Sequence, residues 1–176
     1  MDDEIRKLER DGIVLEAERA RRYEAHLSVL MVNIDGLGVV NEKIGRDAGD
    51  LVLQQTAELI RNNIRRIDVL GRWDQEDFAI LTVDRNVFGS VAMAEKLRRL
   101  ISQHPFAWNG RPFKVTCSIG VARGTPESER QIDRLIESAR AAVLRAKSAG
   151  RNRIEYSGEG AGLSTESGMV RKVTSS

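Results

Sequence analysis

The sequence is nearly free of cysteine, because Cys117 is the one cysteine among 176 residues. A single cysteine excludes an intramolecular disulfide and a cysteine-rich metal site, and this usage fits a reducing compartment. The two histidines, His26 and His104, have no companions that would complete a metal site or a nucleophile–base pair. We therefore expect a cytoplasmic protein that uses neither a disulfide nor a histidine-based site.

The chain also lacks an excess of charge of one sign and a long apolar run. It has 28 Lys and Arg against 26 Asp and Glu, which gives a formal net charge of +2. So small a charge produces no broad field toward nucleic acid or a membrane surface, and any anion site must be local. No apolar run approaches the roughly 20 residues of a membrane span, and no segment resembles a signal peptide. We expect neither nucleic acid nor a membrane as a partner.

The residues that are present suffice for one domain with tails, since 41% of the 176 are hydrophobic. Their periodicity predicts helices alternating with strands. Helices are predicted over 3–25, from the turn at 35–38 to 44, and over 48–65, 87–103 and 130–149, and strands over 26–34, 68–73, 77–83, 111–122 and 153–156.

Local chemistry predicts several boundaries of these elements. Gly12 is a point where the first helix can be interrupted, and Asp47 is placed to cap the helix over 48–65. The strands at 68–73 and 77–83 are close enough to form a hairpin. Residues 158–176 are rich in Gly, Ser, Thr and Glu without periodicity, so we predict a disordered tail.

Four separated motifs follow one another in the chain. They are Asn33-Ile34-Asp35 with Asn41-Glu42 and Gly49-Asp50; Arg65-x-x-Asp68 before the turn Asp74-Gln75-Glu76-Asp77-Phe78; Thr116-Cys117-Ser118-Ile119-Gly120-Val121-Ala122; and Ala146-Lys147-Ser148-Ala149-Gly150-Arg151-Asn152. In this order they resemble the GGDEF domain of diguanylate cyclases, over about residues 15–157.

The resemblance implies an α/β fold with a central, largely antiparallel five-stranded sheet flanked by helices, like the palm of adenylyl cyclases. Residues 1–25 would form a long N-terminal helix that serves as a linker or for homodimerisation, and 15–157 would form the domain. Members of the family join two GTP molecules into cyclic di-GMP, with one GTP on each subunit of a facing dimer.

The catalytic positions depart from the family's pattern. Asn33 stands where the family has a metal-binding Asp, and neutral Asn removes a charge that Mg²⁺ needs. Asp74 and Gln75 replace two glycines that let the backbone approach GTP. Asp77 is one methylene shorter than the family's Glu, although the Ile34 carbonyl and the Glu76 carboxylate remain candidate metal ligands. We therefore expect a degenerate domain without catalytic residues, a resident metal or a cofactor.

A remnant of the GTP site remains an alternative. The resemblance assigns Asn41 and Asp50 to the guanine, and Lys147 and Arg151 to the terminal phosphates. Mg²⁺ would be required only if this remnant is functional. The competing interpretation is structural: Asp50 caps a helix, Asn41 satisfies a turn, and the two cations complement a helix C-terminus.

Arg65 and Asp68 fall where active cyclases carry an Arg-x-x-Asp inhibitory site for cyclic di-GMP. A guanidinium can donate paired hydrogen bonds to the guanine edge or to phosphate, and Asp can accept from guanine. Arg66, Lys96 and Arg98 are the candidates for further ligand contacts. The competing interpretation is an exposed ion pair at a helix end, worth roughly 0 to 1 kcal/mol.

These residues lead to one expected function and two alternatives. We expect an inactive GGDEF-like domain that binds cyclic di-GMP through Arg65 and Asp68 and signals to a protein partner that the sequence does not identify. The first alternative is a residual diguanylate cyclase or a GTP-binding regulatory domain. The second is an interaction or dimerisation module that works without a ligand.

Overall fold

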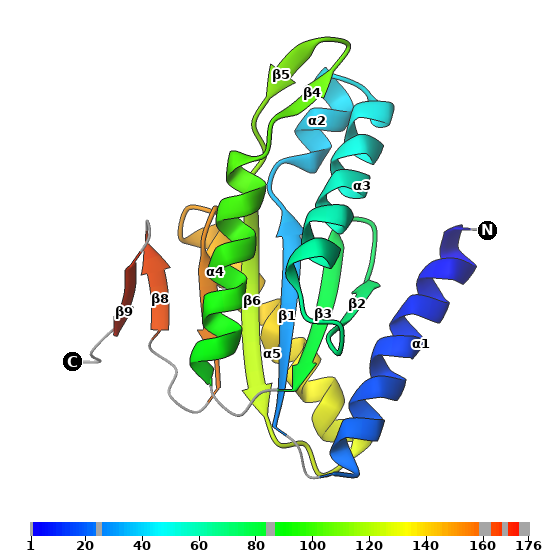
Figure 1. The fold of residues 1–176 in the computed structure, drawn as a ribbon, viewed down its shortest axis with the longest axis vertical. Helices are drawn as coiled ribbons and strands as arrows, with labels where there is room; N and C mark the ends of the chain where they lie inside the picture. Colours follow the sequence, from blue (N-terminus) through cyan, green and yellow to red (C-terminus); the bar gives the residue numbers. More distant parts are fainter. Residues whose placement is uncertain (1, 24–25, 84–86, 159–162, 167–168, 173–176) are drawn as a thin grey trace.

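The computed structural model describes residues 2–23, 26–83, 87–158, 163–166 and 169–172. The larger sheet has the strand order β2-β3-β1-β6-β7-β8-β9 (Figure 1), with β6 and β7 parallel and the other neighbours antiparallel. The bounds are β1 Leu27–Ile34, β2 Val69–Arg72, β3 Asp77–Val83, β6 Cys117–Gly124, β7 Ile154–Ser157, β8 Leu163–Glu166 and β9 Met169–Lys172. The first five strands in this order confirm the predicted five-stranded sheet.

The central strand β1 is buried along its whole length because helices cover both faces of the sheet. Leu30 and Val32 point into one core, and Val29 and Met31 point into the other. Successive side chains of a strand face opposite sides, so a strand covered on both faces has a nearly continuous apolar sequence. This confirms the predicted buried strand and places Asn33, near its end, between β3 and β6.

The helices divide between the two cores. They are α1 Asp2–Arg21, α2 Leu37–Lys43, α3 Arg46–Asn63, α4 Val87–Gln103 and α5 Glu129–Ser148. α2, α3 and α4 pack on one face of the sheet, and α1 and α5 pack on the other (Figure 1). Within the described ranges, no helix combines the length and apolar composition that crossing a membrane requires.

Two predictions of helix details are wrong. Gly12 does not interrupt α1, which is continuous through it because Ile13 and Ala17 of the same helix pack in the core. Asp47 does not cap α3: Gly45 is the N-cap, and Asp47 lies in the first turn, where its charge still complements the helix dipole. α1 ends at Arg21, and residues 24–25 of the predicted helix lie outside the described residues.

The predicted strand over 111–122 is also wrong, because two strands share that segment. β4 (Phe106–Trp108) and β5 (Arg111–Phe113) form a separate hairpin, and β6 begins only at Cys117. The hairpin turns at Asn109 and Gly110, whose φ angles are 49° and 75°. Positive φ at both central residues is what a type I′ turn requires, so the Asn-Gly pair closes a tight hairpin.

The tail differs from the predicted disorder at two segments. β8 pairs antiparallel with β7, and β9 pairs with β8, so residues 163–166 and 169–172 extend the sheet. Composition does not reveal this pairing, because it depends on the hydrogen-bonding groups that β7 offers at its edge. The rest of the predicted disordered segment beyond Gly158 lies outside the described residues.

Gly120 allows β6 to lie directly against α5. A Cβ atom at residue 120 would lie 2.0 Å from the carbonyl oxygen of Ala139 and 2.7 Å from the amide nitrogen of Val143. Both atoms belong to helix backbone, which cannot turn aside as a flexible side chain can. The glycine of the Ser118-Ile119-Gly120-Val121 motif is therefore required by packing.

Gly120→Ala should lower the free energy of unfolding by about 3 kcal/mol, because the added methyl group overlaps the α5 backbone. Gly12→Ala is the matched control, since nothing lies within 4 Å of a Cβ atom there. That variant should gain about 0.5–1 kcal/mol from helix propensity. Urea unfolding measures both changes, and equal stabilities of the two variants would contradict the packing role of Gly120.

Candidate functional site

The turn between β2 and β3 is held by side chains of its own hairpin. The Asp74 carboxylate accepts hydrogen bonds from the amides of Glu76 and Asp77, both at 3.1 Å. Arg72 donates from Nε to the Asp74 carbonyl at 2.8 Å and from Nη2 to the Gln75 carbonyl at 2.5 Å. The Asp74 carboxylate thus occupies two amide donors that a bound anion would otherwise use.

Asn33 and Asp77 face each other across β1 and β3. They are paired in the strand register, and Asn33 Nδ2 donates to Asp77 Oδ1 at 2.6 Å. The other amide atom, Asn33 Oδ1, is buried without a hydrogen-bond partner among the described residues. Burial raises the pKa of Asp77 from 3.8 to about 6; the hydrogen bond and charge of Asp74 add to the rise, whereas Asn33 and Arg140 oppose it.

Asn33 supplies an amide donor, not a charged oxygen ligand, at the end of β1. Mg²⁺ requires several oxygen ligands in octahedral geometry, preferably carboxylates. Here the Asn33 amide directs its hydrogen atoms at Asp77, and the described residues contain no cluster of three Asp, Glu, His or Cys side chains suited to a metal. The remaining sequence candidates are the carbonyl of Ile34 and the half-buried Glu76, whose own carbonyl accepts from the Ile34 amide at 3.4 Å.

Asp35 organises the end of β1, a role that sequence reasoning missed. Its carboxylate accepts from Thr116 Oγ1 and Ser118 Oγ, both at 2.7 Å, and from the Asn152 amide at 3.0 Å. The last bond reaches the loop after α5, where Arg151 and Asn152 have φ of 62° and 47°. The sequence signal was present, because Asp35, Ser118 and Asn152 belong to three of the four motifs.

A pocket of about 290 Å³ opens beside Asn33 and Asp77. Lys147 lines it as well, so the structure brings this predicted phosphate ligand to the end of β1. Glu137 and Arg140, an ion pair at 3.1 Å, complete its charged lining and were missed from the sequence. Their spacing was a usable signal, since Arg140 and Lys147 are seven residues apart and share one face of a helix. Arg151 is exposed and is not among the lining residues.

Asn41 and Asp50, the predicted guanine contacts, lie on α2 and α3. The Asn41 side chain lies over Gly49 so closely that a Cβ atom there would be 1.7 Å from Asn41 Oδ1. The glycine of the Gly49-Asp50 pair therefore makes room for Asn41. Asp50 is exposed one turn inside α3, whose N-cap is Gly45, so the interpretation of Asp50 as a helix cap is wrong.

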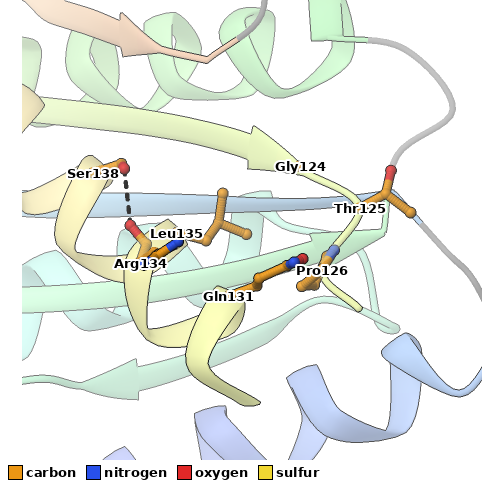
Figure 2. Close-up of a pocket in the computed structure, with 7 residues that line it drawn as sticks. All are labelled: Gly124, Thr125, Pro126, Gln131, Arg134, Leu135 and Ser138. Carbon is orange, nitrogen blue, oxygen red and sulfur yellow. Dashed lines mark hydrogen bonds between the residues drawn. The ribbon is translucent and has the colours of Figure 1, made fainter. Parts of the chain in front are cut away.

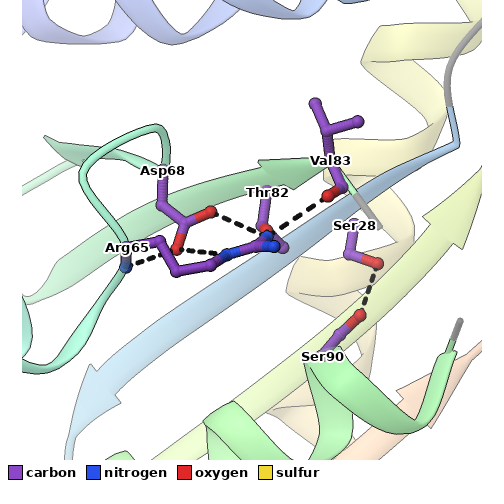
Figure 3. Close-up of polar contacts among 6 residues, drawn as sticks. All are labelled: Ser28, Arg65, Asp68, Thr82, Val83 and Ser90. Carbon is purple, nitrogen blue, oxygen red and sulfur yellow. Dashed lines mark hydrogen bonds and ion pairs between the residues drawn. The ribbon is translucent and has the colours of Figure 1, made fainter. Parts of the chain in front are cut away.

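Arg65 and Asp68 form a closed ion pair rather than an open one (Figure 3). Asp68 accepts from the Arg65 amide at 2.7 Å, from Nε at 3.3 Å and from Nη2 at 3.1 Å. Nη2 also donates to Thr82 Oγ1 and, at 3.2 Å, to the carbonyl of Val83. The Asp68 side chain is 0% exposed and that of Arg65 is 48% exposed, so Arg65 is the member of the pair that faces solvent, and the interpretation as a fully exposed ion pair is wrong.

The structure separates the other predicted arginine and lysine contacts. Arg66 and Lys96 are exposed. Arg98 is buried: it donates to both carboxylate oxygens of Glu95, at 2.9 and 2.6 Å, and to Asn152 Oδ1 at 2.8 Å. Because these bonds hold Arg98 inside the domain, it is not a surface cation beside Arg65, as the sequence had suggested.

A second pocket, of about 220 Å³, lies where β6 ends and α5 begins (Figure 2). Gly124 lines it, and Gly124 pairs with Leu27, so this pocket is at the opposite end of β1 from Asn33. Leu135 and Pro126 supply apolar walls, and the Ser138 hydroxyl is engaged by the Arg134 carbonyl at 2.8 Å. None of the residues predicted from the sequence as site residues lines it.

Comparisons with known proteins agree with this fold. The family model described as diguanylate cyclase, GGDEF domain, matches residues 6–153. Diguanylate cyclase A of Treponema denticola is 31% identical over 131 residues, which are 74% of this chain and 35% of that protein. The chain therefore spans about a third of that relative's length.

Solved structures share the fold. The active GGEEF domain of a diguanylate cyclase from Vibrio cholerae has a TM-score of 0.76 and 26% identity, covering 85% of this chain and 94% of that one. The GGDEF domain of DgcB from Caulobacter crescentus, in complex with c-di-GMP, has a TM-score of 0.75 and 23% identity, covering 83% and 86%. The match of the family model over most of the chain, with this fold and these motifs, shows that the protein belongs to the diguanylate cyclase GGDEF domain family.

Proposed function

We propose that this GGDEF domain does not synthesise cyclic di-GMP and instead binds it as a receptor through Arg65. The observation that carries the proposal is the contrast between the Arg65–Asp68 pair before β2 and the Asn33–Asp77 contact at the start of β3. The Arg65 guanidinium is fixed by a fully buried carboxylate, and the Arg65 side chain as a whole is 48% exposed. The Asn33–Asp77 contact, in contrast, places an amide donor where the family places a metal-binding carboxylate.

Three features oppose nucleotidyl transfer at the turn. The reaction needs cations that neutralise phosphate charge and position the attacking and leaving oxygens. Asn33 supplies no charge, and Asp77 is satisfied by a hydrogen bond from it. Asp74 adds a carboxylate beside the amides of Glu76 and Asp77, which would repel a phosphate at that place.

The receptor half of the proposal gives Asp68 a different role from the one its motif suggests. Asp68 is buried, so it orients the Arg65 side chain instead of accepting hydrogen bonds from guanine. A guanidinium that is held in place loses less conformational entropy when it binds the guanine edge or a phosphate. The exposed Arg66 lies next to it in the chain and would add a second cation. DgcB, which shares this fold, was solved with c-di-GMP bound.

A second candidate function is GTP binding, with or without residual cyclase activity. It is favoured by the Asn41 side chain seated over Gly49 and by Lys147 in the pocket beside Asp77. These are the residues that the family resemblance assigns to the guanine and to the terminal phosphates. Arg140 would then supply part of the positive charge that a metal would otherwise bring.

Calorimetry should detect binding of cyclic di-GMP at micromolar concentration, and Arg65→Ala should weaken it at least tenfold, on the order of a lost charge-assisted hydrogen bond. Arg61→Ala is the matched control, because Arg61 is exposed in the last turn of α3. Arg65→Lys keeps the positive charge but cannot donate the paired hydrogen bonds of a planar guanidinium. Comparing its melting temperature with that of the wild type shows whether a loss of binding is due to a loss of folding. No heat with the wild type, or equal affinities of Arg65→Ala and Arg61→Ala, would refute the receptor function.

Incubation of the wild type with GTP and Mg²⁺ or Mn²⁺ should yield no cyclic di-GMP by nucleotide chromatography, because Asn33 brings no charge for a metal ion and Asp74 adds a carboxylate where a phosphate would lie. A GTP-dependent rise in melting temperature in the same mixtures would support the second candidate. Glu76→Gln is the control for contaminating enzyme. Product that the wild type forms and Glu76→Gln does not would establish residual cyclase activity and overturn the proposed inactivity.

The raised pKa of Asp77 predicts a pH-dependent stability. The folded chain binds this proton more tightly than the unfolded chain, so Asp77 lowers stability progressively as pH rises from about 4 to about 6. Asp77→Asn removes the ionisation. The variant should therefore gain up to about 2 kcal/mol on the wild type between about pH 4 and about pH 7, allowing for solvent screening. Urea unfolding at both pH values tests this, and a constant difference would contradict it.

A further inference from the structure

Arg10, on the N-terminal helix α1, contacts Trp73, the last residue before the turn at residues 74–76. Its Nη2 donates to the carbonyl of Trp73 at 3.1 Å, and its guanidinium carbon lies 4.7 Å from the centroid of the Trp73 ring. The same side chain thus makes a charge-assisted hydrogen bond and a cation–π contact with one residue. Figure 1 shows α1 running alongside β2, the strand that leads into this turn.

The position of Arg10 is determined by the apolar face of α1. Ile13 and Ala17, each 1% exposed, pack in the core that also contains Trp73. Arg10 is one helical turn before Ile13 and therefore lies on the same face, above the hairpin. Trp73 itself is only 7% exposed, so its ring is a fixed platform for the guanidinium.

Three consecutive backbone carbonyls at the turn accept hydrogen bonds from arginine side chains. Arg10 donates to the carbonyl of Trp73, and Arg72 donates to those of Asp74 and Gln75. The Asp74 carboxylate then holds the two amides that follow. Of these contacts, the Arg10 hydrogen bond is the one that comes from outside the hairpin, so a displacement of α1 acts directly on the turn.

We propose that Arg10 is a positioning residue through which the N-terminal helix sets the conformation of the turn at residues 74–76. With α1 docked, the turn keeps its amides on Asp74. With α1 displaced, the turn loses the Arg10 hydrogen bond, and these amides become available to the phosphate of a nucleotide. The inference rests on the second candidate function in one respect only, that a guanine nucleotide is bound next to this turn.

Site-resolved amide exchange, measured by NMR on the whole chain without nucleotide, tests the proposal. Arg10→Ala should accelerate exchange of the Glu76 and Asp77 amides about tenfold, the equivalent of one lost charge-assisted hydrogen bond. Exchange in the middle of β3, at Ile80, should not change. Arg10→Lys, which keeps a cation over Trp73, should restore part of the protection. Arg19→Ala is the matched control, since Arg19 forms an ion pair at 2.9 Å with Glu16 of its own helix and its side chain is 67% exposed.

Two results would overturn the proposal. One is equal exchange of the turn amides in Arg10→Ala and Arg19→Ala. The other is a uniform acceleration that includes Ile80, which would show that Arg10 supports global stability alone. Because no nucleotide is present, failure of cyclic di-GMP or GTP binding leaves this outcome unaffected, and the two proposals can fail independently.

Discussion

The burial of β1 on both faces is the constraint on which the rest of the structure depends. A strand in the middle of a sheet, with helices on either side, cannot shift by one residue without moving its apolar side chains to the wrong core. Its register with β3 and β6 is therefore strongly specified. That register places Asn33 opposite Asp77 on one side and Ser118 on the other, so the geometry of the candidate site follows from hydrophobic packing.

The polar groups at the end of β1 form two connected networks. In one, Asn33 donates to Asp77, whose pKa responds to Asp74 in the turn. In the other, Asp35 holds Thr116, Ser118 and the loop at Asn152. In the first network the two side chains fit one another, because the amide donor of Asn33 satisfies the carboxylate that faces it. Replacing Asn33 with Asp would place two carboxylates face to face, and without a cation between them both carboxylates would be destabilised in their charged form.

The Arg65–Asp68 pair shows where motif spacing stops being informative. Two residues three positions apart at a helix end are close enough to form an ion pair whatever surrounds them. Whether the carboxylate faces solvent or the interior depends on β3, which supplies Thr82 and the Val83 carbonyl to the same guanidinium. The same spacing can therefore belong to a ligand-reading pair or to a buried support for one arginine. The burial of Arg98 likewise could not be predicted from motif spacing, because it depends on hydrogen bonds to Glu95 and Asn152.

The sequence by itself determined the five helices, the buried central strand and the four motifs, and the family that these motifs resemble implied the five-stranded sheet. The helices, the strand and the motifs follow from local periodicity and short patterns, which need no knowledge of distant contacts. Only the tertiary structure decided that Asp68 is buried, that Asp35 and Arg140 belong to the site, that Gly120 is required by the backbone of α5, and that Arg10 reaches Trp73. The physical reason is the same in each case, since burial and hydrogen-bond partners come from segments far apart in the chain.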